Sequence, residues 1–182
     1  MMIPAAIVPP LETARLVMRG HQLADFSHSA AMWADPNVTR YILDQPLSEE
    51  GAWARFLRCF GHWAVLGFGY WLIEEKVTGN FVGEAGFANY KREIDRTLRG
   101  EPEIGWAFVS QAHGKGYATE AVRTLTAWAD ARLRTRTICI IAPENAASVR
   151  VAVKCGYCEL PSTMYRGQST LAFAREPGGG RL

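Results

Sequence analysis

The chain passes from a predicted strand at residues 103–109 into the loop Ser110-Gln-Ala-His-Gly114-Lys-Gly116, and then into a predicted helix that begins near Tyr117. Small residues at a junction between a strand and a helix let backbone N–H groups close around an anion. The positive end of the helix dipole adds to that attraction. The loop therefore predicts an anion-binding site that is made mainly of backbone.

Two familiar phosphate-binding motifs do not match this loop. A P-loop requires Gly at the position of Val109 and Ser or Thr at the position of Gly116, so that motif fails twice. A dinucleotide fingerprint fails at Thr119, where a third small residue belongs, and here it would follow an antiparallel hairpin. The loop does match the pattern Gln-x-x-Gly-x-Gly, through Gln111, Gly114 and Gly116.

The periodicity on either side of the loop predicts a mixed α/β domain. Helices are predicted at residues 25–33 with Asp25 as the cap, at 48–66 with Ser48 as the cap, from Tyr117 to about 133, and from the Asn145 cap to about 154. Strands are predicted at residues 16–19, 70–75, 81–89, 103–109, 136–142, 157–160 and 168–173.

The composition is that of one globular domain. Of the 182 residues, 48% are hydrophobic and 21% charged, with a mean hydropathy of −0.07, which excludes a disordered or fibrous chain. We expect a single domain over residues 1–182, with its core at about 11–175 and a flexible tail at 176–182. The net charge of +2 is too small for an electrostatic footprint toward nucleic acid or a membrane surface.

Most of the four cysteines are interpreted as small buried side chains. Cys155 and Cys158 have CxxC spacing, but no second CxxC or closely spaced His pair completes a zinc site. The first ten residues lack a basic region and contain three prolines, unlike a signal peptide. The uncharged stretch between Arg58 and Glu74 is shorter than the ~18 residues of a membrane span. We therefore expect a cytoplasmic protein without a metal ion.

The helix at residues 48–66 carries aromatic residues at helical spacing, which favours a buried core face. A protein that binds a partner through a Trp-rich surface would instead require Trp53 and Trp63 to be exposed. The residues of the stripe are Trp53, Phe56, Leu57, Phe60 and Trp63.

Four blocks of the sequence resemble, in order, the GNAT superfamily of acyl-CoA-dependent N-acetyltransferases. Gln111-x-x-Gly114-Lys-Gly116-Tyr-Ala-Thr-Glu-Ala121 resembles the pyrophosphate loop of that family, and it is followed by Pro143-Glu-Asn145-x-x-Ser148 with Lys154-x-Gly156-Tyr157. The blocks Glu12-Thr-Ala-Arg15-Leu-x-Met-Arg19 and Gly83-Glu-Ala-Gly86 resemble the RimJ/RimL-like branch, named for enzymes that act on ribosomal-protein N-termini. The resemblance implies a GNAT fold, which is a central mixed, mostly antiparallel twisted sheet with helices on both faces.

The resemblance also implies acetyl-CoA as the acyl donor. Backbone N–H groups from Gly114 to Thr119 would hold the pyrophosphate, so bulky substitutions there should weaken binding more than loss of charge. The preceding strand would part from its neighbour and pair with pantetheine, with the Val109 N–H facing the thioester oxygen. The cofactor-binding residues expected in full are Phe108, Val109, Gln111, Gly114, Lys115, Gly116, Tyr117, Ala118, Thr119 and Asn145.

The catalytic residues that the resemblance implies are Glu103 and Ser148. Related enzymes carry, on this strand, a glutamate that draws a proton off the amine through water, and Glu103 takes that place. Glu84 is the other candidate base, and strand alternation alone does not settle which of the two faces the cleft. Many relatives place a Tyr where this chain has Ala152, so we expect Ser148 to act as the general acid in its stead.

The sequence therefore predicts transfer of an acetyl group from acetyl-CoA to a primary amine, by direct attack in a ternary complex. The acceptor is open between a protein N-terminus and a small molecule, because the two N-terminal helices carry both signs of charge. The alternative is a non-catalytic acyl-CoA-binding or regulatory module of the same fold, which Ala152 permits. A homodimer is compatible with the sequence, and neither nucleic acid nor a membrane is an expected partner.

Overall fold

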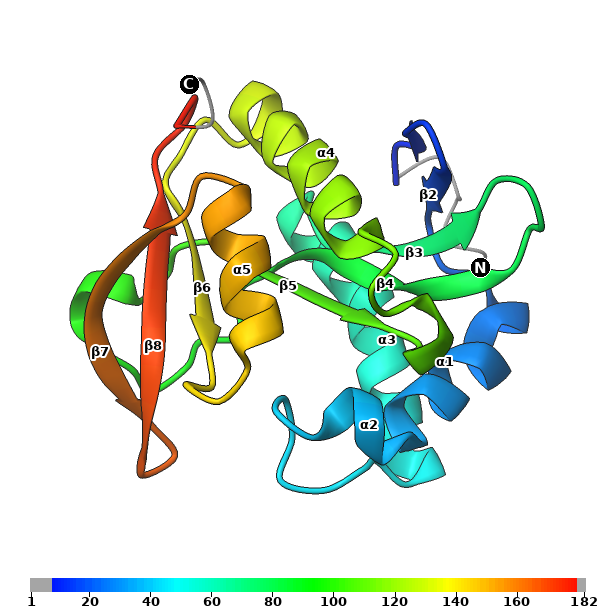
Figure 1. Ribbon diagram of the computed structural model, residues 1–182, viewed down its shortest axis with the longest axis horizontal. Helices are drawn as coiled ribbons and strands as arrows, with labels where there is room; N and C mark the ends of the chain where they lie inside the picture. The colour runs from blue at the N-terminus through cyan, green and yellow to red at the C-terminus, as the bar shows by residue number, and fades with distance from the viewer. Residues whose placement is uncertain (1–7, 180–182) are drawn as a thin grey trace.

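The computed structural model describes residues 8–179, which form an eight-stranded sheet with helices on both faces (Figure 1). The strand order is β1-β2-β3-β4-β5-β6-β8-β7, and among these strands β5 and β6 form the parallel pair while the other neighbours are antiparallel. The strands are β1 (Leu11–Glu12), β2 (Leu16–Arg19), β3 (Tyr70–Glu75), β4 (Phe81–Ala88), β5 (Glu103–Phe108), β6 (Thr137–Ile141), β7 (Cys158–Tyr165) and β8 (Gln168–Arg175). The helices are α1 (Phe26–Ala34), α2 (Pro36–Thr39), α3 (Glu49–Leu66), α4 (Tyr117–Arg132) and α5 (Ala146–Lys154), with 3-10 turns η2 (Leu23–Asp25), η3 (Arg96–Leu98) and η4 (Ser110–Ala112).

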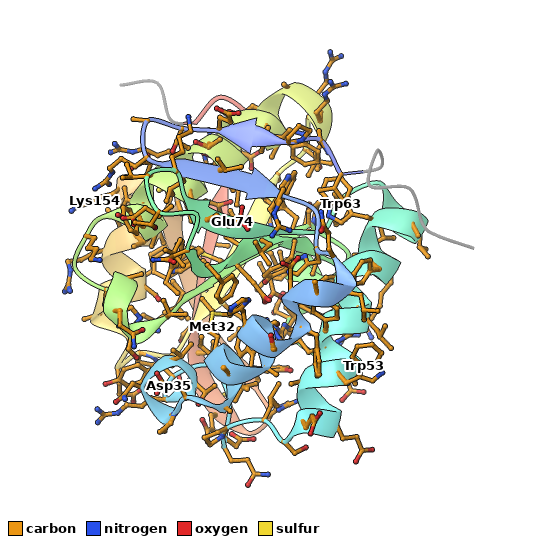
Figure 2. The ribbon with its side chains drawn as sticks, turned by 90° about the vertical axis from the view of Figure 1, so that its right-hand side faces the viewer. Met32, Asp35, Trp53, Trp63, Glu74 and Lys154 are labelled. Atoms are coloured by element: carbon orange, nitrogen blue, oxygen red, sulfur yellow. The ribbon has the colours of Figure 1, made fainter. Side chains whose placement is uncertain are left out.

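The sheet separates two layers of helices. α4 and α5 lie in front of the sheet in Figure 1, with α1 and α3 behind it, and Figure 2 shows both layers from the side. The largest buried cluster packs the sheet against the front layer and includes Trp71, Leu125 and Ala152. A smaller cluster, which includes Trp33 and Ala107, joins α1 to β5. The predicted fold class is confirmed.

Capping residues define where α3 and α5 begin, as the sequence predicts. Ser48 Oγ accepts the Gly51 N–H at 3.2 Å before α3, and Asn145 Oδ1 accepts the Ser148 N–H at 3.1 Å before α5. Each bond satisfies a donor that has no partner inside its helix. The strands agree with the predicted ranges to within a few residues, except that β7 and β8 extend further, while β1 and α2 were not predicted.

The structure corrects two details on the α1–α3 side of the sheet. Asp25 precedes α1 but makes no capping hydrogen bond there, because its carboxylate accepts two hydrogen bonds from Arg19, at 2.8 and 2.9 Å. The aromatic stripe of α3 is buried only in part, since Phe56 and Trp63 are 1% and 4% exposed but Trp53 is 38% exposed. A surface that uses both tryptophans is excluded, because Trp63 lies in the core.

The other sequence expectations concern the cysteines and the ends of the chain. All four cysteines are free thiols, three of them buried, and Cys158 is exposed on β7. Within residues 8–179, no helix combines the length and the apolar composition that a membrane crossing requires. Residues 180–182 of the expected tail lie outside the described residues.

β5 and β6 part from each other soon after they meet. Glu103 is the residue of β5 that pairs with β6, opposite Ile138, while β5 continues unpaired on that side as far as Phe108. On its other side, β5 pairs with β4 along its whole length. The result is an opening within the sheet that has α5 in front of it (Figure 1).

Candidate active site

The glycine loop follows the end of β5 and leads into the N-terminus of α4. Gly114 and Gly116 have φ angles of 75° and 80°, a left-handed conformation that residues with a Cβ rarely adopt. Gly116 is the N-cap of α4 and has no side chain to offer, so the first N–H groups of the helix have no partner within it. The loop thus presents backbone donors at the positive end of a 16-residue helix, as an anion site requires.

Arg15 holds this loop from the side. Its Nη1 donates to the Lys115 carbonyl at 2.9 Å, and its Nε donates to Glu120 at 2.7 Å. Glu120 is the acidic residue in the first turn of α4. Its pairing with Arg15 offsets a negative charge that would otherwise repel an anion at the helix N-terminus. The Lys115 side chain is exposed beside this site.

The first residues of α4 offer their backbone to a ligand rather than their side chains. Tyr117 is 6% exposed, and its hydroxyl donates to Glu75, which anchors α4 to β3. Ala118 and Thr119 are half-buried. Of the predicted loop residues, Gln111 has an exposed side chain in η4.

The hydrogen bonds of β5 correct one expected role. The Val109 N–H donates to the Val82 carbonyl at 3.0 Å, so it faces β4 and is not a free oxyanion donor. Because backbone groups alternate sides along a strand, the N–H and C=O of Phe108 face the opening instead. The Phe108 carbonyl contacts His113 Nε2 at 2.9 Å. The backbone groups that face the opening are therefore those of Phe108 and not the Val109 N–H.

α5 lies in front of the opening (Figure 1), with Asn145 as its N-cap and Ser148 in its first turn. Asn145 Oδ1 accepts the capping hydrogen bond, so the side-chain NH₂ of Asn145 can donate to other partners. Ser148 is half-buried in the first turn of α5. The cap is thus an observed role of Asn145, while its contact with pantetheine stays a prediction.

Both candidate bases project from the same face of the sheet. The register pairs Glu84 of β4 with Ala107 of β5, and Ala88 of β4 with Glu103 of β5. Residues that stand opposite each other share a face, and faces alternate with every residue, so positions 84, 88, 103 and 107 lie on one side. That side is covered by α1 and α3, and Ser29 and Trp33 of α1 donate hydrogen bonds to Glu84.

Glu103 is 7% exposed and is held by one arginine. Arg92 Nε donates to Glu103 Oε2 at 2.7 Å, and Arg92 Nη2 donates to Oε1 at 2.8 Å. This bidentate pair fixes the orientation of the carboxylate. Each carboxylate oxygen has a second lone pair, so the pair still leaves Glu103 able to accept from a water molecule.

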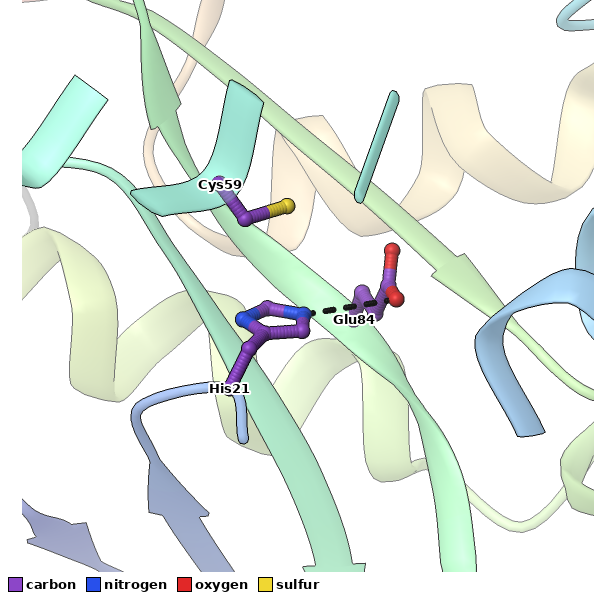
Figure 3. Close-up of side chains that lie close together, drawn as sticks. All are labelled: His21, Cys59 and Glu84. Carbon is purple, nitrogen blue, oxygen red and sulfur yellow. Dashed lines mark ion pairs between the residues drawn. The ribbon is translucent and has the colours of Figure 1, made fainter. Parts of the chain in front are cut away.

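Glu84 is 1% exposed and has three donors around it, one of which is His21 (Figure 3). Its Oε1 accepts from Ser29 Oγ at 2.6 Å and lies 3.3 Å from His21 Nε2, and its Oε2 accepts from Trp33 Nε1 at 3.0 Å. Burial alone would raise the pKa of Glu84, but the hydrogen bond and charge of His21, with smaller contributions from Arg55 and Ser29, lower it to about 2. Glu84 is therefore a poor general base.

The partner of Glu84 carries the complementary charge. Burial disfavours the charged form of His21, yet Cys59 and Glu84 outweigh it and raise the pKa of His21 to about 10. His21, Cys59 and Glu84 place a nitrogen, a sulfur and an oxygen within 4.8 Å of one another, a donor set that zinc accepts. A protonated imidazole has no lone pair for a metal ion, so the cluster fits a buried ion pair better than a metal centre.

A family model described as an acetyltransferase (GNAT) domain matches residues 15–157, which include the glycine loop, the opening and α5. The chain belongs to the GNAT acetyltransferase family. The N-acetyltransferase YnaD of Bacillus subtilis (strain 168), itself described as uncharacterized, is 31% identical over 147 residues, which are 80% of this chain and 81% of YnaD.

Two solved structures share the fold of this GNAT acetyltransferase. An acetyltransferase from Agrobacterium tumefaciens is similar with a TM-score of 0.79 and 27% identity, over 92% of this chain and 94% of that one. The spermidine N-acetyltransferase of Vibrio cholerae, solved with CoA and spermine, has a TM-score of 0.72 at 15% identity, over 92% and 99% of the two chains. The second likeness concerns the fold alone.

Within this GNAT acetyltransferase, the sequence left several residues of the α3 side unassigned. Tyr70 of β3 stands opposite Gly86 of β4, which stands opposite Gly105 of β5. Gly86 leaves room for the backbone of Gly69 and Tyr70, and Gly105 leaves room for the Tyr70 hydroxyl, which accepts a hydrogen bond from Tyr90 at 3.2 Å. The signal in the sequence was a glycine on each of two adjacent strands, but only the strand register shows that these two glycines stand opposite each other.

Proposed function

We propose that this chain transfers an acetyl group from acetyl-CoA to a primary amine by direct attack in a ternary complex. The observation that carries the proposal is the opening between β5 and β6, which begins after Glu103 and leads to the glycine loop before α4. A substrate with an extended arm and a pyrophosphate matches both parts, since the Phe108 backbone can pair with the arm and the loop can hold the anion.

The reaction forms one bond and breaks one. The amine nitrogen attacks the thioester carbonyl, a C–N bond forms, the C–S bond breaks, and the amine gives up a proton while the leaving thiolate gains one. We assign the first proton transfer to Glu103, through a water molecule that uses a lone pair left free by Arg92. Glu84 is less suited, because three donors already occupy its carboxylate.

Ser148 is the proposed proton donor to the thiolate. It lies in the first turn of α5, beside the opening, and Ala152 one turn later is 0% exposed, so the position that carries a Tyr in many relatives is filled by a methyl group in the core. The RimJ/RimL-like branch, which rests on the sequence blocks at residues 12–19 and 83–86, and a cytoplasmic location are further parts of this proposal.

Two measurements test the proposed function in turn. Isothermal titration of purified protein with acetyl-CoA should show saturable binding at one site per chain. A chromogenic thiol reagent should then show CoA release with some members of a panel of primary amines. No binding would contradict the whole proposal. Binding without thiol release from any amine, including protein N-terminal peptides, would favour the non-catalytic acyl-CoA-binding module.

A further inference from the structure

One face of the β7–β8 hairpin contacts the segment that joins β4 to β5 (Figure 1). Thr163 and Tyr165 lie on the same face of β7, because side chains alternate along a strand, and Met164 between them is 58% exposed. Thr163 Oγ1 accepts the Asp95 N–H at 3.4 Å. Tyr165 packs against a buried cluster to which the segment contributes Ile94. The end of the hairpin is therefore fixed against the chain that leads into β5.

Arg92 of this segment contacts two aromatic rings. Its Cζ lies 4.5 Å from the centre of the Tyr90 ring and 4.6 Å from the centre of the Tyr165 ring. Its Nη1 also donates to the Tyr165 hydroxyl at 2.5 Å. A guanidinium this close to an aromatic ring is attracted to it. Tyr165 therefore holds Arg92 through both its ring and its hydroxyl.

Arg92 divides its three nitrogens between Tyr165 and the proposed base. Nε and Nη2 donate to the Glu103 carboxylate, while Nη1 donates to Tyr165. The guanidinium is planar and rigid, so the direction of the Nη1 bond and the directions of the two carboxylate bonds are set together. A change in the contact with Tyr165 would therefore turn the Glu103 carboxylate, together with the lone pairs that it offers to a water molecule.

The orientation of Arg92 depends on these side-chain contacts, because its backbone belongs to neither a helix nor a strand. Between β4 and β5 the chain forms the 3-10 turn η3 and is otherwise irregular. Such connecting segments are more mobile than the elements that they join. Tyr165, in contrast, is held in a sheet, since β7 pairs with β8 as far as Tyr165 and Gln168. The hairpin therefore sets the position of Arg92, and not the reverse.

We propose that Tyr165 is a positioning residue for the acetyl transfer, which acts through Arg92 to hold the Glu103 carboxylate in the orientation that takes a proton from the acceptor amine. The inference rests on the proposed function, and it makes the β7–β8 hairpin part of the catalytic machinery. A displacement of about 1 Å in a catalytic group can cost about 100-fold in rate, so the contribution of Tyr165 belongs to kcat. Neither Tyr165 nor Arg92 belongs to the glycine loop, so acetyl-CoA should bind equally well without this contact.

The first test is Tyr165→Phe, which removes the hydroxyl and keeps the ring. In the thiol-release assay with both substrates saturating, we expect kcat to fall at least about fivefold and the KM for acetyl-CoA to stay within about twofold of wild type. The matched control is Tyr41→Phe, at an exposed tyrosine whose ring centre lies 5.1 Å from Arg40 Cζ, and it should keep the wild-type kcat. An unchanged kcat in Tyr165→Phe would overturn the inference and leave the proposed function intact. A loss that lies wholly in the KM for acetyl-CoA would overturn it as well.

A double-mutant cycle separates positioning from a direct role of Tyr165 in proton transfer. If Tyr165 acts through Arg92 on Glu103, Tyr165→Phe should change kcat by less than about twofold in a Glu103→Gln background and in an Arg92→Met background. Glu103→Gln keeps the size of the side chain, so this background serves even if Arg92→Met does not fold. A full loss of kcat on adding Tyr165→Phe to Glu103→Gln would show that Tyr165 acts independently of the base, and it would overturn the inference. A wild-type protein that releases no thiol with any amine would contradict the proposed function, and this inference with it.

Discussion

The hydroxyl of Tyr70 occupies the space that a side chain on Gly105 would need. A Cβ added to Gly105 would overlap the Tyr70 oxygen but would remain 3.4 Å from Cζ, which is an ordinary contact. The glycine thus allows an aromatic ring from β3 to extend across β4 and place a polar group on β5.

This relationship predicts a strong coupling between the two positions. Gly105→Ala should lower the free energy of unfolding by about 1–3 kcal/mol, because Tyr70 must move out of its packed position. In a Tyr70→Phe background the same substitution should cost at least about 1 kcal/mol less, because the overlapping oxygen is gone. A double-mutant cycle by urea denaturation measures the difference, and additive effects would show that Tyr70 does not lie where the structure places it.

Glu103→Gln should reduce kcat by about 10²–10⁴-fold, because the amide cannot take a proton from the amine. Initial rates of thiol release measure kcat, and circular dichroism confirms folding. The matched control is Glu101→Gln, whose carboxylate lies two residues away and 3.8 Å from Arg136. A Glu103→Gln rate within about threefold of wild type would remove Glu103 from the mechanism.

In the glycine loop, shape should matter more than charge. Gly116→Val places a β-branched side chain at a φ of 80°, so we expect the Kd for acetyl-CoA to rise at least about tenfold. Lys115→Ala removes an exposed cation and should raise the Kd only about two- to fivefold. Isothermal titration compares the two variants directly, and the reverse order would mean that the Lys115 charge, and not the backbone, dominates anion binding.

The buried pair of His21 and Glu84 predicts how stability depends on pH. The pKa of His21 is raised from 6.5 to about 10, so its contribution is complete below about pH 6.5 and is lost as the pH rises toward 10. The pKa of Glu84 is lowered from 4.5 to about 2, so its contribution is complete above about pH 4.5 and is lost as the pH falls toward 2.

The free energy of unfolding should therefore be highest between about pH 5 and 6.5 and should fall between pH 7 and 9 by up to about 1.4 kcal/mol per pH unit. Urea denaturation at several pH values gives this slope. The double variant His21→Gln/Glu84→Gln, which keeps the size of Glu84 and removes the ionising pair, should lose most of it. Equal slopes in the two proteins would mean that His21 is not charged in the folded state.

The sequence predicted much of the fold because local signals and tertiary packing agree. Ser48 and Asn145 cap their helices in the structure, as the sequence predicts. Gly114 and Gly116 of the loop have positive φ angles, a conformation that glycine adopts readily. The prediction that Asp25 caps α1 was wrong, because its carboxylate forms an ion pair and makes no capping hydrogen bond. Arg19, six residues earlier at the end of β2, forms the ion pair with Asp25.

The candidate site could be predicted from the sequence only where it is local. The loop and the Asn145 turn are contiguous, whereas the partners of Glu84 come from two other segments, His21 after β2 and Ser29 and Trp33 on α1. The sequence did not show whether the Val109 N–H faces β4 or the opening, because this depends on the register between β4 and β5.

The parting of β5 and β6 has a further consequence for solubility. An unpaired strand edge is a template for another chain, and here such an edge lies inside a sheet. It is short, α5 shields it, and the ring of His113 covers the carbonyl of Phe108. An acyl-CoA arm that pairs with this edge would cover it and prevent pairing with another chain. On heating, light scattering from aggregates should therefore begin at a higher temperature with saturating acetyl-CoA than without it.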